Sequence, residues 1–489
     1  MSKFDAVIIG GGHNGLVCAS YLSKNGYKTL ILEKNEKLGG LANYGSSLNG
    51  MSSKVLQELQ IHLPQLTTKS YVVALDDEQQ HTIIHNDGSK TSFHATNASI
   101  ENQKKFIALI DKYKLYSSTL STLMHDTPPR LKSGNSSDTW KLITMGWKVR
   151  KLGKKNMREF LRVLGLNIAD ELEDNLDDKN LMGLIAHEAV LGSNLGPRSP
   201  GSVLTLLYKQ AIQGSLFSSE KYDFHQLIPS LEKNCLGQGV EIKNNTSVKK
   251  IITDHNKATG VLLESGETIE GSIIISNADP KTTYFKLLGT EPLDTDFIRR
   301  AKNFRAKGNV AKFTITLDEK PIIKNIDKDM MNARFVYAPS INYIEKAFNA
   351  SKYNKYEKNL CFEFQHCENT IVANVNYVPY VQNTSYDKEQ LTQQCIDLLQ
   401  PFIANLNITK AEFSSPNDMA DKYNVSGGQW NHGEFEIDQM LMMRPFYGSA
   451  QYSTPIENLY LCGAGTHPNG SITGINGRNA AKKIIGDKK

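Results

Sequence analysis

A glycine turn between an apolar run and a helical pattern lies near the N-terminus, and this feature constrains the fold most strongly. Residues 6–9 are apolar, residues 10–15 read Gly-Gly-Gly-His-Asn-Gly, and a helical pattern then ends at Asn25-Gly26. A second apolar run, residues 29–32, ends in Glu33. A strand, a glycine turn, a helix and a second strand that ends in an acidic residue make up the unit that binds dinucleotides.

Each glycine of this turn has a separate physical role. Gly10 permits the tight turn, Gly12 lets the backbone approach a pyrophosphate, and Gly15 lets the helix pack closely on the strand. The helix directs its unpaired amide groups and the positive end of its dipole at the phosphates, so residues 12–16 form an anion cradle. Glu33 stands where such sites hold a ribose hydroxyl.

The residues after Glu33 indicate which dinucleotide is bound. Residues 34–41 read Lys-Asn-Glu-Lys-Leu-Gly-Gly-Leu, so a short polar step follows the acid and leads to paired glycines. This pattern resembles FAD proteins more than NAD proteins, because Gly39 and Gly40 let the chain pass close to the cofactor. The sequence has no second glycine fingerprint for NAD(P)H. We therefore predict FAD as the cofactor.

Composition limits the classes of protein to consider. At 489 residues the chain is too long for one ordinary core, so we expect two intertwined domains. The formal charge of +5 is too small to argue for a nucleic acid, and we predict none as a partner. Without a secretory signal pattern or an apolar stretch long enough to cross a bilayer, we expect a cytoplasmic protein. The six cysteines contain no Cys-x-x-Cys pair, so we predict free thiols, no metal site and no redox disulfide.

The middle of the chain predicts strands, then helices. Residues 69–75, 81–85 and 90–94 have strand patterns. From residue 102 to residue 178, apolar residues recur at three- and four-residue spacing, which predicts helices. Residues 195–201 interrupt this pattern and predict a loop or the start of a helix.

Strands return in the second half of the chain. Residues 241–253, 258–264 and 268–276 predict a β-meander, which in many flavoproteins completes the cofactor domain. Within the last of these strands, residues 273–275 are all isoleucine. Such a run is typical of a strand that is buried on both faces of a parallel sheet.

The C-terminal segment offers a second helix N-terminus. The apolar run of residues 459–462 breaks into Gly463-Ala464-Gly465, and a glycine-rich loop then leads into a helix over residues 476–485. In flavoproteins such a terminus faces the pyrimidine end of the isoalloxazine, where negative charge collects on reduction. We therefore expect the two ends of the chain to form two halves of one flavin site.

Several motifs together resemble one family. They are Gly-Gly-Gly-His-Asn-Gly-Leu at 10–16, Gly-Pro-Arg-Ser-Pro-Gly at 196–201, Ser-Asn-Ala-Asp-Pro at 276–280, Leu-Cys-Gly-Ala-Gly-Thr-His-Pro at 461–468 and Gly-Arg-Asn-Ala-Ala at 477–481. With them the chain resembles, over nearly its whole length, the phytoene desaturase-related FAD-dependent oxidoreductases of the carotenoid desaturase and amine oxidase superfamily.

The resemblance implies an α/β fold. Its first domain is a Rossmann-like FAD-binding domain of the glutathione-reductase type, with a parallel sheet plus a β-meander, and its second is an α+β substrate domain. We expect the FAD-binding domain in residues 1–75, 200–290 and 415–489, and the substrate domain in residues 76–199 and 291–414, with a helical subregion over 102–178.

We expect FAD to contact residues from both ends of the chain and from the meander. The resemblance implies that Val248 lies near the adenine ring. Related amine oxidases carry an acidic residue after the late strand to hold the ribityl chain, whereas this chain has Ala464 and Gly465, so backbone groups must substitute. The predicted cofactor residues are Gly10, Gly12, His13, Asn14, Gly15, Glu33, Lys34, Gly39, Gly40, Leu41, Val248, Asn277, Gly463, Gly465, Thr473, Gly474 and Ile475.

Two histidines are candidates for a catalytic base. Dehydrogenation at a flavin needs a C–H bond held against N5, exclusion of water and, in some reactions, a base for the second hydrogen. The candidates are His467 in the late loop and His432, which precedes Arg444-Pro445 in a segment that resembles the family's flavin-facing stretch. A loop histidine is more often a hydrogen-bonded scaffold residue than a base. We interpret His13, in the phosphate turn, as a packing or backbone-contact residue.

Three functions fit these features. The first is dehydrogenation, or desaturation, of a hydrophobic unsaturated small molecule by hydride transfer to flavin N5, with oxygen or a quinone as electron acceptor by analogy with carotenoid desaturases. The second is redox-neutral isomerisation or saturation of a polyene or lipid. The third is a non-catalytic FAD-binding protein that regulates or scaffolds partners. The substrate-domain residues carry no fingerprint that separates the three.

Residues 140–155 predict a helix that contacts a membrane peripherally. The stretch is basic and holds Trp140 and Trp147, which are seven residues apart and therefore share a helix face. Such a helix can lie in a lipid interface and admit an apolar substrate from the bilayer. The alternative is a solvated basic face whose tryptophans are buried in the substrate domain.

Overall fold

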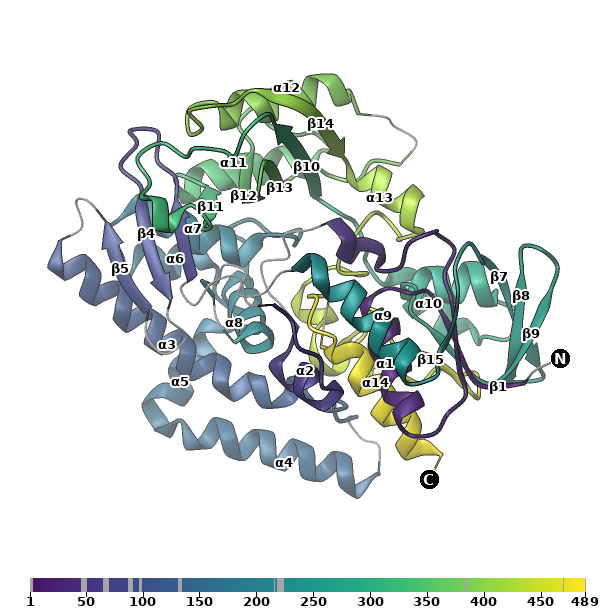
Figure 1. Ribbon diagram of the computed structural model, residues 1–489. Coiled ribbons are helices and arrows are strands. Elements are labelled where there is room, and N and C mark those ends of the chain that lie inside the picture. Colours follow the sequence, from purple (N-terminus) through teal and green to yellow (C-terminus); the bar gives the residue numbers. More distant parts are fainter. Residues whose placement is uncertain are drawn as a thin grey trace.

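The computed structural model describes residues 3–44, 51–64, 70–86, 91–95, 99–130, 134–214, 216–217, 224–382, 386–468 and 470–488. They form two sheets with helices packed against them (Figure 1). Both termini lie on the side of the first sheet, and the second sheet extends across the opposite side (Figure 1).

The first sheet joins the two ends of the chain. Its parallel strands are β6 (Glu241–Lys243), β2 (Thr29–Leu32), β1 (Phe4–Ile9), β9 (Thr268–Ser276) and β15 (Leu459–Leu461), in that order. β1 lies between β2 and β9, and its residues Ala6, Val7 and Ile8 have no exposed surface. β15, from the end of the chain, pairs with the second half of β9.

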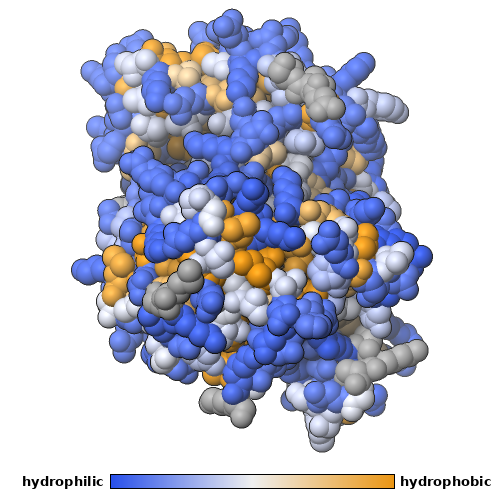
Figure 2. Space-filling model, turned by 90° about the vertical axis from the view of Figure 1, so that its right-hand side faces the viewer, coloured by the Kyte–Doolittle hydropathy of each residue, from blue (hydrophilic) through white to orange (hydrophobic). Residues whose placement is uncertain are grey.

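The meander continues from the same sheet. β7 (Val248–Asp254), β8 (Lys257–Leu263) and the first half of β9 pair antiparallel. This arrangement is a Rossmann-like parallel sheet plus a β-meander, so the predicted fold class is confirmed. Figure 2 shows the flank of the molecule on the side of this meander, which is largely hydrophilic with hydrophobic patches across its middle.

The single strand expected over residues 241–253 is wrong. Asn245 adopts a left-handed backbone with φ 50°, and the chain turns there between β6 and β7. The amide of Asn245 donates to the carbonyl oxygen of Asn35, and that of Thr246 donates to the carbonyl oxygen of Glu33. The break therefore brings the start of the meander beside the end of β2.

The second sheet is mostly antiparallel. Its order is β14 (Ile408–Ser414), β10 (Val310–Leu317), β13 (Thr370–Asn376), β12 (Cys361–Cys367), β11 (Arg334–Tyr337), β3 (Ser70–Ala74), β4 (Thr82–Asn86) and β5 (Thr91–Ala95). β3 pairs parallel with β11, with Val73 opposite Phe335. Residues 70–74 thus lie in the second sheet, whereas the boundary at residue 75 assigned them to the FAD-binding domain. Their apolar side chains are buried on both faces of the strand, Tyr71 and Val73 in one core and Val72 and Ala74 in the other.

Helices cover both sheets. α1 (His13–Lys24) lies between α14 (Ile475–Asp487) and α9 (Leu227–Gly237) on the first sheet. The helical part expected over 102–178 contains α3 (Ile100–Met124), α4 (Ser136–Lys151), α5 (Gly153–Val163) and α6 (Ile168–Glu173), and α7 (Lys179–Val190) and α8 (Ser202–Gln213) follow it. The remaining helices are α2 (Ser53–Leu59), α10 (Thr295–Asn303), α11 (Ile341–Lys352), α12 (Lys388–Leu399) and α13 (Pro416–Tyr423). In the described part of the chain, no helix combines the length and apolarity needed to span a membrane.

The close crossing of α1 and α14 predicts a specific effect of substitution. A Cβ at Gly477 would lie 2.2 Å from the backbone oxygen of Asn14, whereas a Cβ at Gly486, on the same helix, meets nothing within 4 Å. We expect Gly477→Ala to lower the free energy of unfolding by about 2 kcal/mol, because two helix backbones must move apart. Gly486→Ala is the control and should be neutral or slightly stabilising. Equal unfolding curves in urea for the two variants would contradict this packing.

Candidate functional site

A pocket lies where the carboxyl ends of β1, β2 and β9 face residues of β10 and β13. In parallel α/β sheets, ligands bind at this edge. The predicted cofactor residues that line the pocket are Gly10, Gly12, His13, Asn14, Glu33, Lys34, Gly39, Gly40, Leu41, Val248 and Asn277. The turn, the end of β2, the paired glycines and the start of the meander therefore face one cavity.

The glycine turn leaves no room for side chains. Gly10 has φ 98°, which favours glycine. A Cβ at Gly12 would lie 2.8 Å from Nδ2 of Asn277, and one at Gly15 would lie 2.3 Å from the backbone oxygen of Gly10. Nδ2 of Asn277 donates to that same oxygen at 3.2 Å. Gly15 does not line the pocket, and its part is to let α1 start directly behind the turn.

Glu33 is buried directly after β2, and it is one of the residues that line the pocket. Its Oε2 accepts a hydrogen bond from the amide of Gly11 at 2.8 Å, and its Oε1 accepts one from the amide of Asn35 at 2.9 Å. These two donors fix the carboxylate. A carboxylate oxygen accepts more than one hydrogen bond, so each oxygen retains acceptor capacity for a ribose hydroxyl.

The late loop contributes different residues from those predicted. Gly463, Gly465, Thr473, Gly474 and Ile475 do not line the pocket, whereas Ala464, Gly470, Ser471 and Ile472 do. The predicted residues lie behind this surface, since a Cβ at Gly463 would be 2.5 Å from the backbone oxygen of Asn277 and one at Gly465 would be 2.4 Å from Pro280. Thr473 accepts a hydrogen bond from the amide of Ile475 at the start of α14. The glycine motif reveals the loop but not which of its residues face the cavity.

His13 and His432 both line the pocket although 419 residues separate them in the sequence. Burial, together with the neighbouring His432, lowers the pKa of His13 to about 3. Burial also lowers the pKa of His432, while Asp279 opposes that shift. Both imidazoles are therefore neutral at pH 7. Among the described residues, Nε2 of His13 and Nδ1 of His432 have no hydrogen-bond partner, so polar groups remain for a ligand.

His467 does not line the pocket, and its placement favours a structural role over the predicted catalytic one. The side chain has no exposed surface, and its Nε2 lies 2.9 Å from the carbonyl oxygen of Leu123 at the end of α3. Burial lowers the pKa of His467 to about 4, so the ring is neutral and donates to that carbonyl. His467 thus attaches the late loop to α3.

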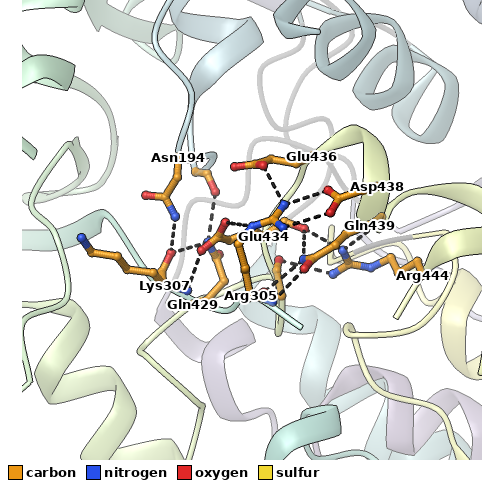
Figure 3. Close-up of polar contacts among 11 residues, drawn as sticks. Asn194, Arg305, Lys307, Gln429, Glu434, Glu436, Asp438, Gln439 and Arg444 are labelled. Atoms are coloured by element: carbon orange, nitrogen blue, oxygen red, sulfur yellow. Dashed lines mark hydrogen bonds and ion pairs between the residues drawn. The ribbon is translucent and has the colours of Figure 1, made fainter. Parts of the chain in front are cut away.

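Arg444 is fully buried and connects two segments that face the pocket (Figure 3). Its guanidinium donates to backbone carbonyl oxygens of Asn431, Gly433, Glu434 and Gln439 in the preceding segment, and of Ala464 and Thr466 in the late loop. Burial lowers the pKa of Arg444 to about 10, which still leaves the group charged at neutral pH. Sequence reasoning placed this residue in the right segment without assigning it a role.

Arg305 anchors the same segment from outside. It donates to the carboxylates of Glu434, Glu436 and Asp438 at 2.7–3.1 Å, as Figure 3 shows. Glu434 also accepts a hydrogen bond from the amide of Lys307 at 3.0 Å. The backbone that carries His432 is therefore held by one arginine on each side.

The inner end of the pocket contains residues that sequence reasoning missed. They come from four separate elements, α7, α8, β10 and β13, and from the loop before His432, and they are Glu188, Lys209, Lys312, Asn374 and Trp430. The ammonium group of Lys312 lies 5.2 Å from the centre of the Trp430 ring. Trp430 fits here because Gly192, with φ 73°, has no side chain, since a Cβ would lie 2.4 Å from the indole nitrogen.

A buried ion-pair network lies beside these residues. Arg334 donates to Glu188 and, at 3.0 Å, to Glu363, which also accepts from Asn374. The ammonium of Lys209 donates to the carbonyl oxygens of Glu188 and Leu191 at 2.9 and 2.8 Å. Burial lowers the pKa of Lys209 to about 8.

One sequence signal could have found part of this network. Lys312 is the one charged residue in the otherwise apolar or hydroxyl-bearing strand Val310–Leu317, and Glu363 interrupts the apolar start of Cys361–Cys367 in the same way. A charge within a buried strand is costly unless it is paired, and it often marks a functional site. Glu188 and Lys209 lie in helices that are otherwise ordinary, and no local signal distinguishes them.

The fixed carboxylate of Glu33 predicts a loss of cofactor affinity when it is changed. In Glu33→Gln an amide NH₂ group faces the donor of Gly11 or Asn35, and the ribose loses a charged acceptor. We expect FAD affinity to fall roughly tenfold or more, because a hydrogen bond to a charged group contributes about 1.5–3 kcal/mol. The control is Glu36→Gln, an exposed residue nearby, which should bind FAD as the wild type does. Unchanged affinity of Glu33→Gln in fluorescence titration would contradict this role.

The contacts of Arg444 predict a large effect on stability. In Arg444→Met, buried carbonyl oxygens lose their donor, so we expect the free energy of unfolding to fall by at least about 3 kcal/mol and FAD to dissociate faster. Arg299→Met removes an exposed arginine and should change stability by less than about 0.5 kcal/mol. Chemical denaturation of both variants checks this. An Arg444→Met protein as stable as the control would contradict the bridging role.

Comparisons with known proteins agree with this geometry. The chain is 24% identical to the rat (Rattus norvegicus) protein called pyridine nucleotide-disulfide oxidoreductase domain-containing protein 2, over 100% of this chain and 94% of the relative. It is 22% identical to a phytoene desaturase (lycopene-forming) of Pseudescherichia vulneris, over 96% of both chains. The fold resembles that of a putrescine oxidase structure with putrescine bound, with a TM-score of 0.63 and 13% identity over 100% of this chain and 99% of that chain.

The family assignment follows from the whole chain rather than from one motif. The resemblance drawn from the sequence motifs is confirmed, and so is FAD as the cofactor. Three features of the pocket fit that cofactor. They are the imidazole nitrogens of His13 and His432 that have no partner among the described residues, the glycine turn without side chains, and the carboxylate of Glu33 held by two amides. A match over residues 15–485 shows that the chain belongs to the family of flavin-containing amine oxidoreductases.

Proposed function

We propose that this protein dehydrogenates a substrate that joins an apolar, unsaturated body to a polar group, with oxygen or a quinone as the electron acceptor. The observation that carries the proposal is the composition of the inner end of the pocket. Leu191 and the Trp430 ring offer apolar surface there, while Glu188, Lys209 and Lys312 bring charge to the same wall.

The charged groups favour a substrate with a polar group. A buried charge loses its hydration when an apolar ligand covers it, which costs free energy unless the ligand offers a partner. Lys312 is only 7% exposed, and Asn374 lies opposite it on the neighbouring strand. A purely hydrocarbon substrate would gain no polar contact from these groups, whereas a polar group on the substrate would gain charge-assisted contacts, so we extend the expected hydrophobic substrate to one with a polar end.

The residues of this chain bind and orient the reactants. Bound FAD supplies a two-electron acceptor. The glycine turn and Glu33 would hold its dinucleotide part, and Ser471 and Ile472 line the same pocket as His13 and His432. Because Lys312 lines the same pocket as the glycine turn, a substrate held by Lys312 would share that pocket with the cofactor.

His432 is the remaining candidate for a proton acceptor. Its ring is neutral at pH 7, so Nδ1, which has no partner among the described residues, can accept a proton. The lowered pKa means that the proton is not retained, which suits a group that passes it on. The carboxylate of Asp279 stabilises the protonated form, as its raising effect on the pKa of His432 indicates.

The names of relatives are consistent with this proposal. The relative named above is a lycopene-forming desaturase of phytoene by its name, and the putrescine oxidase structure holds putrescine. The pocket described here has both kinds of surface.

The proposal predicts which compounds reduce the flavin. Without oxygen, we expect an unsaturated acid or amine to bleach the flavin absorbance faster than the hydrocarbon of equal length. Lys312→Met should reduce the preference for the acid by about tenfold, because it removes a buried cation that attracts a carboxylate. Lys320→Met, on the loop after β10, is the control and should keep the preference.

Two results would contradict the proposal. Turnover of a polyene with no net flavin reduction would favour the redox-neutral isomerase or saturase. Bound FAD that no lipid extract, acid, amine or hydrocarbon reduces would favour the non-catalytic FAD-binding protein.

A further inference from the structure

Among the described α-helices, α4 has the smallest share of buried residues. Of its sixteen residues, Asp138 alone is buried. The helix lies along the lower edge of the molecule, away from both sheets (Figure 1). A helix of this length without a buried stripe gains little from packing, so its apolar residues need another explanation.

Large apolar side chains gather on one exposed face of α4. Trp140, Ile143 and Trp147 are spaced three and four residues apart, and 68%, 54% and 57% of their surfaces are exposed. This spacing places them on one side of a helix. The tryptophans are therefore not buried in the substrate domain, which was the alternative weighed from the sequence.

Basic residues surround this face. Residues 139–158 contain seven lysines and arginines and no acidic residue. On a helix, Lys148 lies to one side of the stripe and Arg150 to the other. Lys151 follows on the stripe itself, and its ammonium lies 5.9 Å from the centre of the Trp147 ring. The apolar face therefore has a cationic rim on both sides.

We propose that α4 lies in the interface of an anionic lipid bilayer, with Trp140, Ile143 and Trp147 among the acyl chains and the lysines and arginines at the headgroups. An exposed apolar face with a basic rim is the arrangement by which helices bind such surfaces. Tryptophan favours the boundary between headgroups and acyl chains. Long lysine side chains lie along apolar surface while their charge reaches the headgroups.

The charge pattern argues against other occupants. A second copy of this chain on the same face would bring two cationic surfaces together without acidic residues between them. A nucleic acid would match the cations but would leave Trp140, Ile143 and Trp147 in water. An anionic bilayer satisfies both the apolar stripe and its rim.

The test uses the full chain with FAD and sedimented vesicles of phosphatidylcholine, with or without phosphatidylglycerol, at physiological salt. We expect binding to the anionic vesicles. The double variant W140S/W147S should bind about tenfold more weakly, because the buried apolar area is lost. The affinity of the triple variant K148Q/R150Q/K151Q for anionic vesicles should fall roughly fivefold for each cation removed. This loss of affinity should be smaller in high salt.

Matched controls distinguish binding through the exposed face of α4 from nonspecific binding to vesicles. Tyr353→Ser removes another aromatic residue, one that is 77% exposed on α11's C-cap, and K249Q/K250Q removes two exposed cations of β7. Both should bind vesicles as the wild type does. Because these residues are exposed, apart from the half-buried Lys148, every variant should unfold at the same urea concentration and retain FAD, which checks that binding alone has changed.

Several outcomes would overturn the proposal. In the first, the wild-type protein stays in the supernatant when anionic vesicles are sedimented. In the second, the W140S/W147S variant binds anionic vesicles as strongly as Tyr353→Ser does. A change from dimer to monomer in W140S/W147S without loss of vesicle binding would show that a second copy covers the face. Binding of a DNA or RNA duplex that needs the cations but not the tryptophans, with no binding to vesicles, would assign the face to nucleic acid.

Discussion

Three distant segments meet at Asn277, and the site depends on how closely they approach. The amide of Asn277 donates to the carbonyl oxygen of Ile9 at 2.9 Å, and its side chain donates to that of Gly10. From the other end of the chain, a Cβ at Gly463 would lie only 2.5 Å from the backbone oxygen of Asn277. Such contacts exclude side chains at several positions, so the glycines are consequences of chain convergence.

Two arginines hold the segments that line the pocket. Arg444 connects the segment before it to the late loop through carbonyl oxygens alone, and Arg305 holds that segment from outside through carboxylates. Carbonyl partners leave the Arg444 charge uncompensated by any carboxylate in direct contact among the described residues. A buried cation of this kind adds positive potential beside the cavity, which would stabilise the negative charge of phosphates and of a reduced cofactor bound there.

Local patterns predicted much of the first sheet, because a strand, a turn and a helix are read from neighbouring residues. The turn at residues 10–15, Glu33 and the meander follow from such patterns. The prediction of one strand over 241–253 is wrong because Asn245 adopts a left-handed backbone conformation. Asparagine tolerates that conformation, but an asparagine in the sequence does not by itself predict it. The inner pocket was missed for a different reason. Glu188, Lys312 and Trp430 meet through tertiary packing, and His467 looks like a base in the sequence but donates to the carbonyl of Leu123 in the fold.

The central claim is that both ends of the chain and the loop after β9 form one FAD site. The most direct test is the absorbance spectrum of freshly purified protein, together with the mass of the nucleotide released on denaturation. The account predicts a flavin spectrum and a released mass equal to that of FAD, in proportion to the number of chains. A colourless protein that takes up no FAD during incubation with excess cofactor would contradict it.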